Sequence, residues 1–496
     1  MKLFHVPARY VLALMGFWGT FTQILFKQNI SVAIIEMVDF AGLENFSTST
    51  QNSTLTSDTN WTTQQNLLEI PECPDMGAEA DSNRTSLKDE FKFLWTGSQQ
   101  GLVLGSYSYG VVVSLVAMTS LSRKVGHVRL LGYCIFATSI LTILTPVVTE
   151  AGGYIALVVL RACCGILSGH TISQLFGLAG IWSPPQERSK IVSFMLAGAP
   201  IGQSCFMPVA GVLAGSLGWK SVFYVTGGCG VCWSILWLIL IHETPEKHPR
   251  ILDSEKRYIT SSLSHRQQST EKRNIPWLKM LKSRPLYCLV AVHFCSVYGR
   301  TTFRLLLPTY LRTALKFDVK TSGILSAVPF ALAGLLLFVC GPLADYFILK
   351  GIRPIIVRKI FTGFGMVLSC VAVVILIYSG CNVVQVISMV TITIAMDSFA
   401  VPGFKSCLIE ISPEFSGIIF GMSATIANCS GILAPQITGV LRDAYGYFGW
   451  QIAFWIAAAA YLFGGLEFCI FGTNERQVWK KPNNHQSSVM TLTENI

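Results

Sequence analysis

The stretch YIALVVLRACCGILSGHTISQLFGLAGIW (Tyr154–Trp182) is a long apolar run with one arginine, and it ends abruptly in SPPQERSK (Ser183–Lys190). About 20 apolar residues suffice to cross a bilayer. An ionised arginine in hydrocarbon is costly even after snorkelling, so Arg161 predicts a functional site within a membrane. Gly165 and Gly169 follow at four-residue spacing, which opens one helix face to a neighbouring helix or a solute. The alternative is that Arg161 only caps a neighbouring helix.

The composition places most of the chain in lipid. Hydrophobic residues make up 51% of the 496 residues, charged residues make up 13%, and the mean hydropathy is +0.52. Soluble domains carry about 25% charged residues. Windows long enough to span recur twelve times, which predicts an all-α membrane protein with twelve transmembrane helices. The windows are 11–38, 99–121, 130–148, 154–182, 191–214, 222–241, 286–310, 323–347, 360–378, 383–409, 415–441 and 450–471.

A charged segment divides these spans into six and six. The predicted domains are an N-terminal half at 1–241, a cytoplasmic linker with short surface helices at 242–285, a C-terminal half at 286–472 and a cytoplasmic tail at 473–496. Two pseudo-symmetric six-helix halves that meet at a midplane site form the architecture of a major-facilitator carrier.

Basic residues and glycosylation sequons agree on the orientation. Lysine and arginine are concentrated near the N-terminus, in alternate loops and in the linker, so both termini are predicted to be cytoplasmic. The first loop on the opposite side, 42–91, is rich in serine and threonine. It holds four N-x-S/T acceptors, which require a lumenal or extracellular loop. These acceptors are Asn45, Asn52, Asn60 and Asn83.

No pattern for a metal, a cofactor or an enzyme accompanies the spans. The sequence has no pair of C-x-x-C motifs, no H-E-x-x-H and no G-x-S-x-G. Nearly all of the 15 cysteines lie in apolar runs, where they act as small hydrophobes. Cys73 and Cys381 lie in outer loops, and a disulfide between them is left open. The net charge of +10 reflects the sidedness of the loops, so no nucleic-acid partner is expected.

Cations outnumber acids inside the predicted spans. A buried charge needs a partner, so the excess predicts a mobile anion as substrate. Arg300 and Arg304 lie four residues apart on one helix face and form a clamp suited to carboxylate or phosphate. The cations are Lys27, Arg161, Arg300, Arg304 and Lys405; the acids are Asp397 and Glu467 within spans and Glu36, Asp345 and Glu410 at span ends.

Two of the cations have alternative roles. Arg304 lies within a turn of Pro308 and can snorkel to the outer surface. Lys405 lies near the cytoplasmic end of its span, where pairing in a gate or snorkelling competes with substrate contact. It follows Asp397 by eight residues, so the two share a helix side without touching.

Several strings resemble solute carrier family 17, which holds sialin, the vesicular glutamate transporters and the sodium/phosphate cotransporters. The resemblance extends from Ala8 to Lys481. It implies a carrier of small anions. The matching strings are NISVAI (29–34), WSPPQERS (182–189), GWKSVFY (218–224), TPEKHP (244–249), LSAVP (325–329) and VRKI (357–360). The string GPLAD (341–345) also resembles a loop signature of the major facilitator superfamily, which implies that Asp345 latches a cytoplasmic gate.

Departures from the family pattern bear on coupling. Lys27 stands where the family has arginine, which keeps the charge but loses the bidentate fork. Cys164 and Ser168 occupy the positions of the family's fourth-span glutamates. In the tenth span, Leu408 replaces a histidine and Glu410 replaces an aspartate. Coupling is therefore predicted to follow membrane potential or sodium more than protons.

The sequence thus predicts a secondary active transporter of small organic anions or inorganic phosphate, which works by alternating access as a monomer. The coupling cation would be sodium or a proton, and the membrane would be the plasma membrane or that of an endolysosomal or secretory vesicle. The alternative is a transport-inactive anion sensor that signals through the linker. The predicted substrate-binding residues are Lys27, Arg161, Arg300 and Arg304, and the predicted gate or coupling residues are Asp345, Asp397, Lys405 and Glu410.

Overall fold

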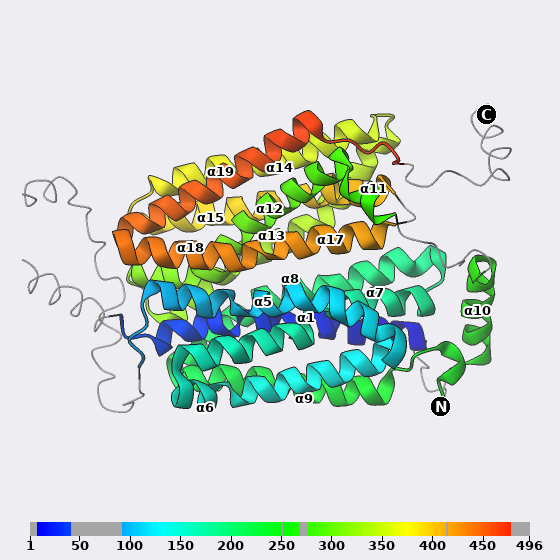
Figure 1. Cartoon of the computed structure of the whole chain (residues 1–496), viewed down its shortest axis with the longest axis horizontal. Coiled ribbons are helices and arrows are strands. Elements are labelled where there is room, and N and C mark those ends of the chain that lie inside the picture. Colours follow the sequence, from blue (N-terminus) through cyan, green and yellow to red (C-terminus); the bar gives the residue numbers. More distant parts are fainter. Residues whose placement is uncertain (1–6, 41–91, 250, 268–275, 413–414, 478–496) are drawn as a thin grey trace, which may run out of the picture.

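The computed structural model describes residues 7–40, 92–249, 251–267, 276–412 and 415–477, and these form one bundle of long helices (Figure 1). The N-terminal half consists of α1 (Ala8–Met37), α5 (Gly97–Val125), α6 (His127–Ser168), α7 (Thr171–Trp182), α8 (Pro185–Leu217) and α9 (Trp219–Leu240). The linker holds η1 (Pro245–Lys247), α10 (Asp253–Gln267) and α11 (Trp277–Leu281). The C-terminal half consists of α12 (Arg284–Thr313), α13 (Val319–Leu349), α14 (Pro354–Ile377), α15 (Val383–Asp397), η2 (Val401–Lys405), α16 (Ser406–Glu410), α17 (Ser416–Asn428), α18 (Ser430–Tyr445) and α19 (Tyr447–Phe471).

The helices make six passes in each half, which confirms the predicted fold class. α6 reverses direction at Gly153 (φ 60°, ψ −154°) and therefore passes twice, its second pass continuing into α7. In the other half, α15, η2 and α16 together make one pass, as do α17 and α18. Glycines with positive φ at Gly126 and Gly218 allow the short reversals between α5 and α6 and between α8 and α9.

Apolarity identifies most of these passes as membrane spans. In the part of the chain that the structure describes, eight stretches are long and apolar enough to cross a membrane. One of them, 127–182, contains both passes of α6. The helices α1, α5 and α12 are less apolar and are not among the eight. Two of these three carry charged and amide side chains in mid-span, such as Lys27, Asn29 and Arg300. Two of the least apolar helices, α1 and α12, therefore hold three of the four predicted substrate-binding residues, Lys27, Arg300 and Arg304.

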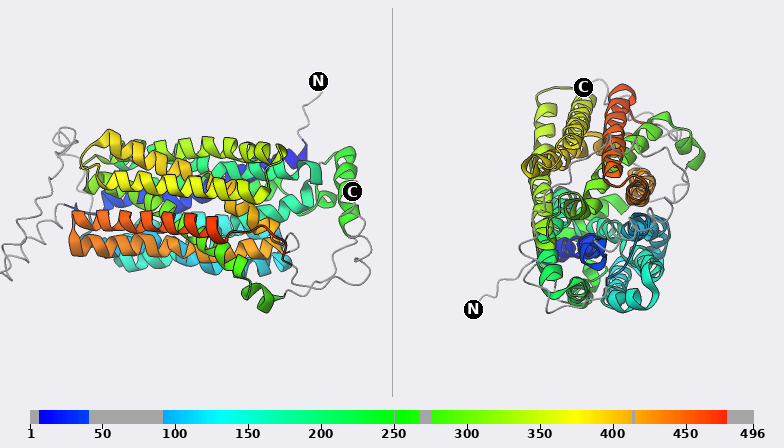
Figure 2. Two further views of the ribbon diagram at one scale, coloured as in Figure 1. Left: turned by 90° about the horizontal axis from the view of Figure 1, so that it is seen from above. Right: turned by 90° about the vertical axis from the view of Figure 1, so that its left-hand side faces the viewer.

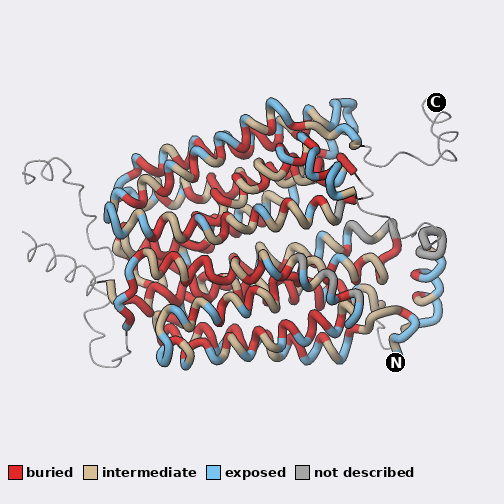
Figure 3. The backbone as a smooth tube through the Cα atoms, in the orientation of Figure 1, coloured by how far each residue is buried: buried red, intermediate tan, exposed pale blue. Residues whose placement is uncertain are grey.

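The two halves lie side by side along the length of the bundle (Figures 1 and 2). We call the end where α1 begins and α19 ends the inner end, and the opposite end, where α1 ends and α5 begins, the outer end. Buried residues line the centre of the bundle, while its sides are exposed (Figure 3). These exposed sides are themselves apolar, with Ile239 and Leu335 each 65% exposed, as expected for a surface that faces lipid.

At the outer end, two glycine-lined seams hold the halves together. A Cβ added to Gly101 of α5 would lie 2.5 Å from the backbone oxygen of Pro435 in α18, and one added to Gly211 of α8 would lie 3.0 Å from the Cα of Gly323 in α13. The carboxylate of Asp443 accepts bonds from the backbone N–H groups of Gly97 (2.5 Å) and Ser98 (2.7 Å). The structure is therefore closed at its outer end.

Filling the seam between α5 and α18 is expected to prevent the two halves from closing at the outer end. In Gly101→Val, the new side chain meets backbone rather than a flexible side chain, at an overpacking cost of about 1–3 kcal/mol, or roughly tenfold in the closed population. The side chains of Ser98 and Gln436 lie 3.2 Å apart across the seam, so Ser98→Cys/Gln436→Cys should crosslink there. The crosslink yield should fall with Gly101→Val and remain unchanged with Gly228→Val, whose added Cβ meets nothing within 4 Å. An undiminished yield in Gly101→Val would contradict the seam.

Candidate functional site

An ion pair fixes the centre of the C-terminal half. Arg300 of α12 donates from Nε to Asp397 Oδ2 at 2.6 Å, and its Nη2 also pairs with that oxygen. Ser296, one turn earlier on α12, donates to the other carboxylate oxygen at 2.7 Å. Asp397 is 1% exposed, so this carboxylate is buried and fully engaged. Arg300 is therefore not free in this state, and the sequence did not indicate its pairing with Asp397.

Two further cations, Arg304 and Lys405, lie near this pair, and a third, Lys27, lies near Arg304. Arg304 lies one turn beyond Arg300, and its Nε is buried without a hydrogen-bond partner. Arg304 lies close enough to Lys27 of α1 for the two positive charges to repel each other. Lys405 lies within electrostatic range of Arg300, Arg304 and Asp397. No ion pair joins Lys27, Arg304 or Lys405 to an acid among the described residues. The two halves thus bring together a cluster with an excess of positive charge, which we call the central cation cluster (Lys27, Arg300, Arg304 and Lys405).

A π-helical turn brings Lys405 to this cluster. η2 interrupts the tenth pass, and Gly403 within it has a non-helical ψ of −105°. A Cβ on Gly403 would lie 2.0 Å from Thr362 Oγ1, so the turn packs directly against α14. The prediction that Lys405 lies near the cytoplasmic end of its span treats the tenth pass as a regular helix. The adjacent Pro402 and Gly403 are the sequence signal from which a break could have been predicted.

Arg161 is bound to α1. Its Nη1 donates to Asn29 Oδ1 at 2.8 Å, and its Nη2 donates to the backbone oxygens of Phe26 (3.3 Å) and Lys27 (3.2 Å). Its guanidinium lies over the ring of Tyr107, and the residue is 3% exposed. Both terminal nitrogens are committed to α1, which is the arrangement expected of a helix clamp. Because one acceptor is the backbone of Lys27, the clamp also sets the position of that lysine.

A neutral hydrogen-bond network occupies the positions at which family relatives are expected to carry glutamates. The hydroxyls of Tyr107 and Ser168 lie 2.7 Å apart, and Ser168 also donates to the backbone oxygen of Cys164 at 2.6 Å. The amide of Gln23 donates to the backbone oxygen of Ser168. Each of these groups is satisfied without an ionised side chain.

The predicted gate acids have different surroundings. Glu410 accepts from Arg358 Nη2 at 2.8 Å and from Asn474 at 3.2 Å, so it connects α14, α16 and the segment after α19 at the inner end. Arg358 also donates to the backbone oxygen of Pro402, in η2. Asp345 is exposed near the inner end of α13, and no ion pair of it is found among the described residues.

The linker is fastened to the N-terminal half. Glu255 of α10 accepts from the backbone N–H groups of Ala8 (3.0 Å) and Arg9 (3.2 Å) at the start of α1. Arg9 pairs in turn with Glu187 at 3.0 Å. α10 begins at Asp253, within the segment 242–285 in which short surface helices are predicted.

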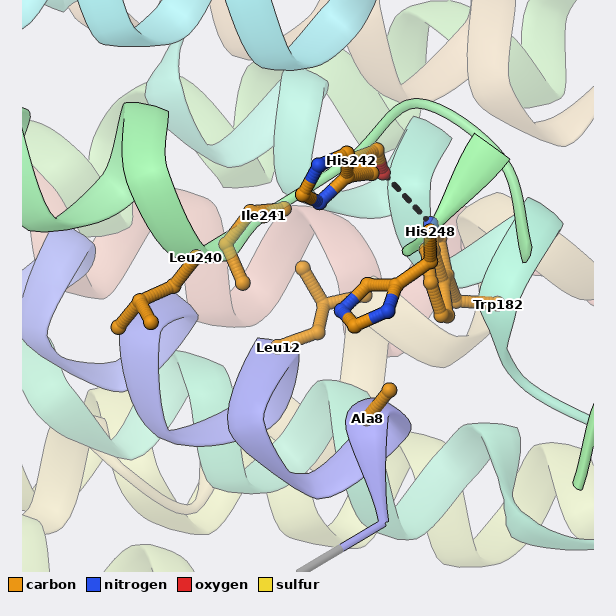
Figure 4. A pocket seen from close by; sticks show the side chains of 7 residues that line it. All are labelled: Ala8, Leu12, Trp182, Leu240, Ile241, His242 and His248. Carbon is orange, nitrogen blue, oxygen red and sulfur yellow. Dashed lines mark hydrogen bonds between the residues drawn. The ribbon is translucent and has the colours of Figure 1, made fainter. Parts of the chain in front are cut away.

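A small hollow beside the start of α1 is not a solute site. It is too shallow to enclose a water molecule, and a hydrogen bond from the indole N–H of Trp182 to the backbone oxygen of His242 lies beside it (Figure 4). Its lining has no fixed charge, and it lies at the inner end, away from the central cation cluster. The lining residues are Ala8, Leu12, Trp182, Leu240, Ile241, His242 and His248.

Predictions on the outer loops are tested in part. Cys381 is disulfide-bonded, and Cys73, for which a bridge to Cys381 was left open, lies outside the described residues. The four glycosylation acceptors, Asn45, Asn52, Asn60 and Asn83, also lie outside them.

Comparison with known proteins agrees with this geometry. A family model described as Major Facilitator Superfamily matches residues 16–435 and 289–493. Human sialin is 34% identical over 96% of this chain and 92% of its own, and a putative inorganic phosphate cotransporter of Drosophila melanogaster is 31% identical over 96% and 87%. A bacterial homologue of the lysosomal transporter Spinster, solved in an inward-facing conformation, shares the fold with a TM-score of 0.66, at 13% identity over 95% of this chain and 99% of that one.

The fold and the charged centre define a multi-pass membrane transporter rather than an enzyme. The chain belongs to the major facilitator superfamily and, within it, to solute carrier family 17, as the matching strings indicated.

Proposed function

We propose that the protein is a secondary active carrier of a small organic anion or inorganic phosphate, and that the anion binds at the central cation cluster. The observation that carries this proposal is the charge imbalance: the central cation cluster holds four cations and one buried carboxylate, and that carboxylate is engaged by Arg300. Uncompensated charge inside a membrane protein is costly, and a bound anion would offset it. The relatives named sialin and putative inorganic phosphate cotransporter support the choice of an anion.

The cluster residues take different parts in this proposal. Lys27 and Arg304, from opposite halves, contact the anion directly, because neither has an acidic partner among the described residues. Arg300 can exchange Asp397 for substrate, which would couple occupancy to the conformation of the C-terminal half. Arg161 holds α1 in place, so it positions Lys27 and, contrary to the prediction from the sequence, does not contact the substrate. The Arg358–Glu410 pair and Asp345 act at the inner gate.

Removing one cation from each half is the direct test. Lys27→Ala and Arg304→Gln are each expected to weaken apparent anion affinity at least tenfold, since a charge-assisted bond contributes about 1.5–3 kcal/mol. Lys27→Arg keeps the charge and should keep transport. The measurement is uptake of phosphate, glutamate, sialate and urate into proteoliposomes, with Lys480→Gln in the tail as the matched control. Unchanged affinity in both variants would refute the proposed site.

The same vesicles identify the coupling ion and test the alternative of a sensor. We propose coupling to membrane potential or sodium, because Cys164 and Ser168 leave the N-terminal half without a carboxylate at these positions. Uptake driven equally well by a pH gradient, with voltage clamped, would contradict this. Binding of anions without flux under any gradient would favour the sensor.

We further propose that both termini are cytoplasmic, that the loop 42–91 is glycosylated, and that the protein acts as a monomer in the plasma membrane or in an endolysosomal or secretory vesicle membrane. Replacing Asn45, Asn52, Asn60 and Asn83 together should abolish the mobility shift caused by a glycosidase. Persistence of the shift would contradict the orientation.

A further inference from the structure

The short helix α11 has an apolar face that is largely exposed in the described part of the chain. Trp277 is 49% exposed, Leu278 is 75% exposed and Leu281 is 46% exposed. At 100° per residue, these three side chains share one side of the helix. Met280, on a different side, is fully buried in the hydrophobic core. α11 is therefore anchored by one residue and presents three apolar side chains outward.

Basic side chains flank this apolar face. Lys279, Lys282 and Arg284 are exposed, and no ion pair of theirs is found in the described part of the chain. The next aromatic residue, Tyr287, is 61% exposed, and its hydroxyl donates to the backbone oxygen of Leu281 at 2.5 Å. That bond fastens α11 to the start of α12, so the basic and apolar groups keep a fixed arrangement.

The location of α11 suits a membrane surface. It lies toward the inner end of the C-terminal half (Figure 1), and the green segment that leads into α12 projects sideways from the bundle (Figure 2). A segment that projects sideways where a span leaves the bilayer lies over lipid rather than over protein. Tryptophan and tyrosine favour this interfacial level, and lysine and arginine there attract acidic headgroups.

We propose that α11 and the first turn of α12 form an interfacial anchor that binds acidic phospholipid headgroups of the cytoplasmic leaflet. Trp277, Leu278 and Leu281 enter the boundary between headgroups and acyl chains, while Lys279, Lys282 and Arg284 contact the phosphates and carboxylates above it. A wholly apolar face would suit neutral lipid or another protein equally well, and the basic flank is what selects an acidic lipid. The anchor holds the inner end of α12, the helix that carries Arg300 and Arg304.

The test is lipid binding by the purified full-length chain in a neutral detergent. Phosphatidylserine should raise the thermal unfolding midpoint, while phosphatidylcholine at the same concentration should not. Lys279→Gln/Lys282→Gln should weaken the apparent affinity for phosphatidylserine roughly tenfold or more. The matched control, Lys256→Gln/Arg257→Gln, removes two charges from α10 and should leave that affinity unchanged.

Two further measurements keep the outcome decisive. High salt should abolish the phosphatidylserine effect on the wild-type chain, because exposed charges are then screened. Leu278→Ser should weaken phosphatidylserine binding while all of the charges remain. Equal responses to the two lipids, insensitivity to salt, or equal loss of affinity in the α10 control would overturn the proposal. None of these readouts depends on the identity of the transported anion.

Discussion

Asp397→Ala is expected to destabilise the protein far more than Arg300→Ala, although the two residues form one ion pair. Breaking a buried pair from one side costs about 3–5 kcal/mol, because the remaining charge is left without a partner. The two remaining charges have different neighbours. Without Arg300, the negative charge of Asp397 can still be compensated by Lys405 or Arg304, because both cations already lie within electrostatic range of it. Without Asp397, the whole central cation cluster loses its acid.

The measurement is the thermal unfolding midpoint of detergent-purified variants, together with their yield from the membrane. The double variant Arg300→Ala/Asp397→Ala should recover part of the stability lost in Asp397→Ala, since it removes the unpaired cation as well. Asp345→Ala is the matched control, because that acid is exposed and should change stability by no more than about 0.5 kcal/mol. Equal loss in the two single variants would contradict the asymmetry. Transport should be lost in Asp397→Ala even where protein is recovered.

Arg161→Lys is expected to reduce transport at least tenfold although it preserves the charge. Lysine is a point charge and cannot reproduce the fork that reaches Asn29 with one nitrogen and the backbone of Phe26 and Lys27 with the other. Loss of this clamp releases the part of α1 that positions Lys27. We expect at least a tenfold loss of transport with near-normal surface expression, measured by uptake normalised to protein at the membrane.

Asn29→Ala separates this positioning role from substrate contact. Asn29 is 1% exposed and lies against Arg161, so it reaches the anion only through the arginine and Lys27. Its replacement should raise the apparent KM for the anion in the same direction as Arg161→Lys. The control is Asn428→Ala, because among the described residues the amide of Asn428 donates within its own helix, to the backbone oxygen of Ala424. Full transport by Arg161→Lys would instead indicate that Arg161 acts as a simple charge.

The sequence was sufficient for the architecture because hydrocarbon imposes simple rules. Apolar length defines the spans, and the charged segment between them separates six from six. The same reasoning identified Lys27, Arg300, Arg304 and Lys405, since a cation in a span stands out against its apolar surroundings. The matching strings then identified the family, as the comparisons show.

Only the tertiary structure decided which charges are engaged. Arg300 and Asp397 are 97 residues apart in the chain, and Arg161 and Asn29 are 132 apart, so no local pattern records these contacts. The π-helical turn at Val401–Lys405 changes the direction of Lys405 by inserting residues into a helix that periodicity treats as regular. The sequence alone shows which charged side chains lie within spans and must therefore be buried. Their partners depend on how distant helices pack, because buried charges are compensated through space rather than along the chain.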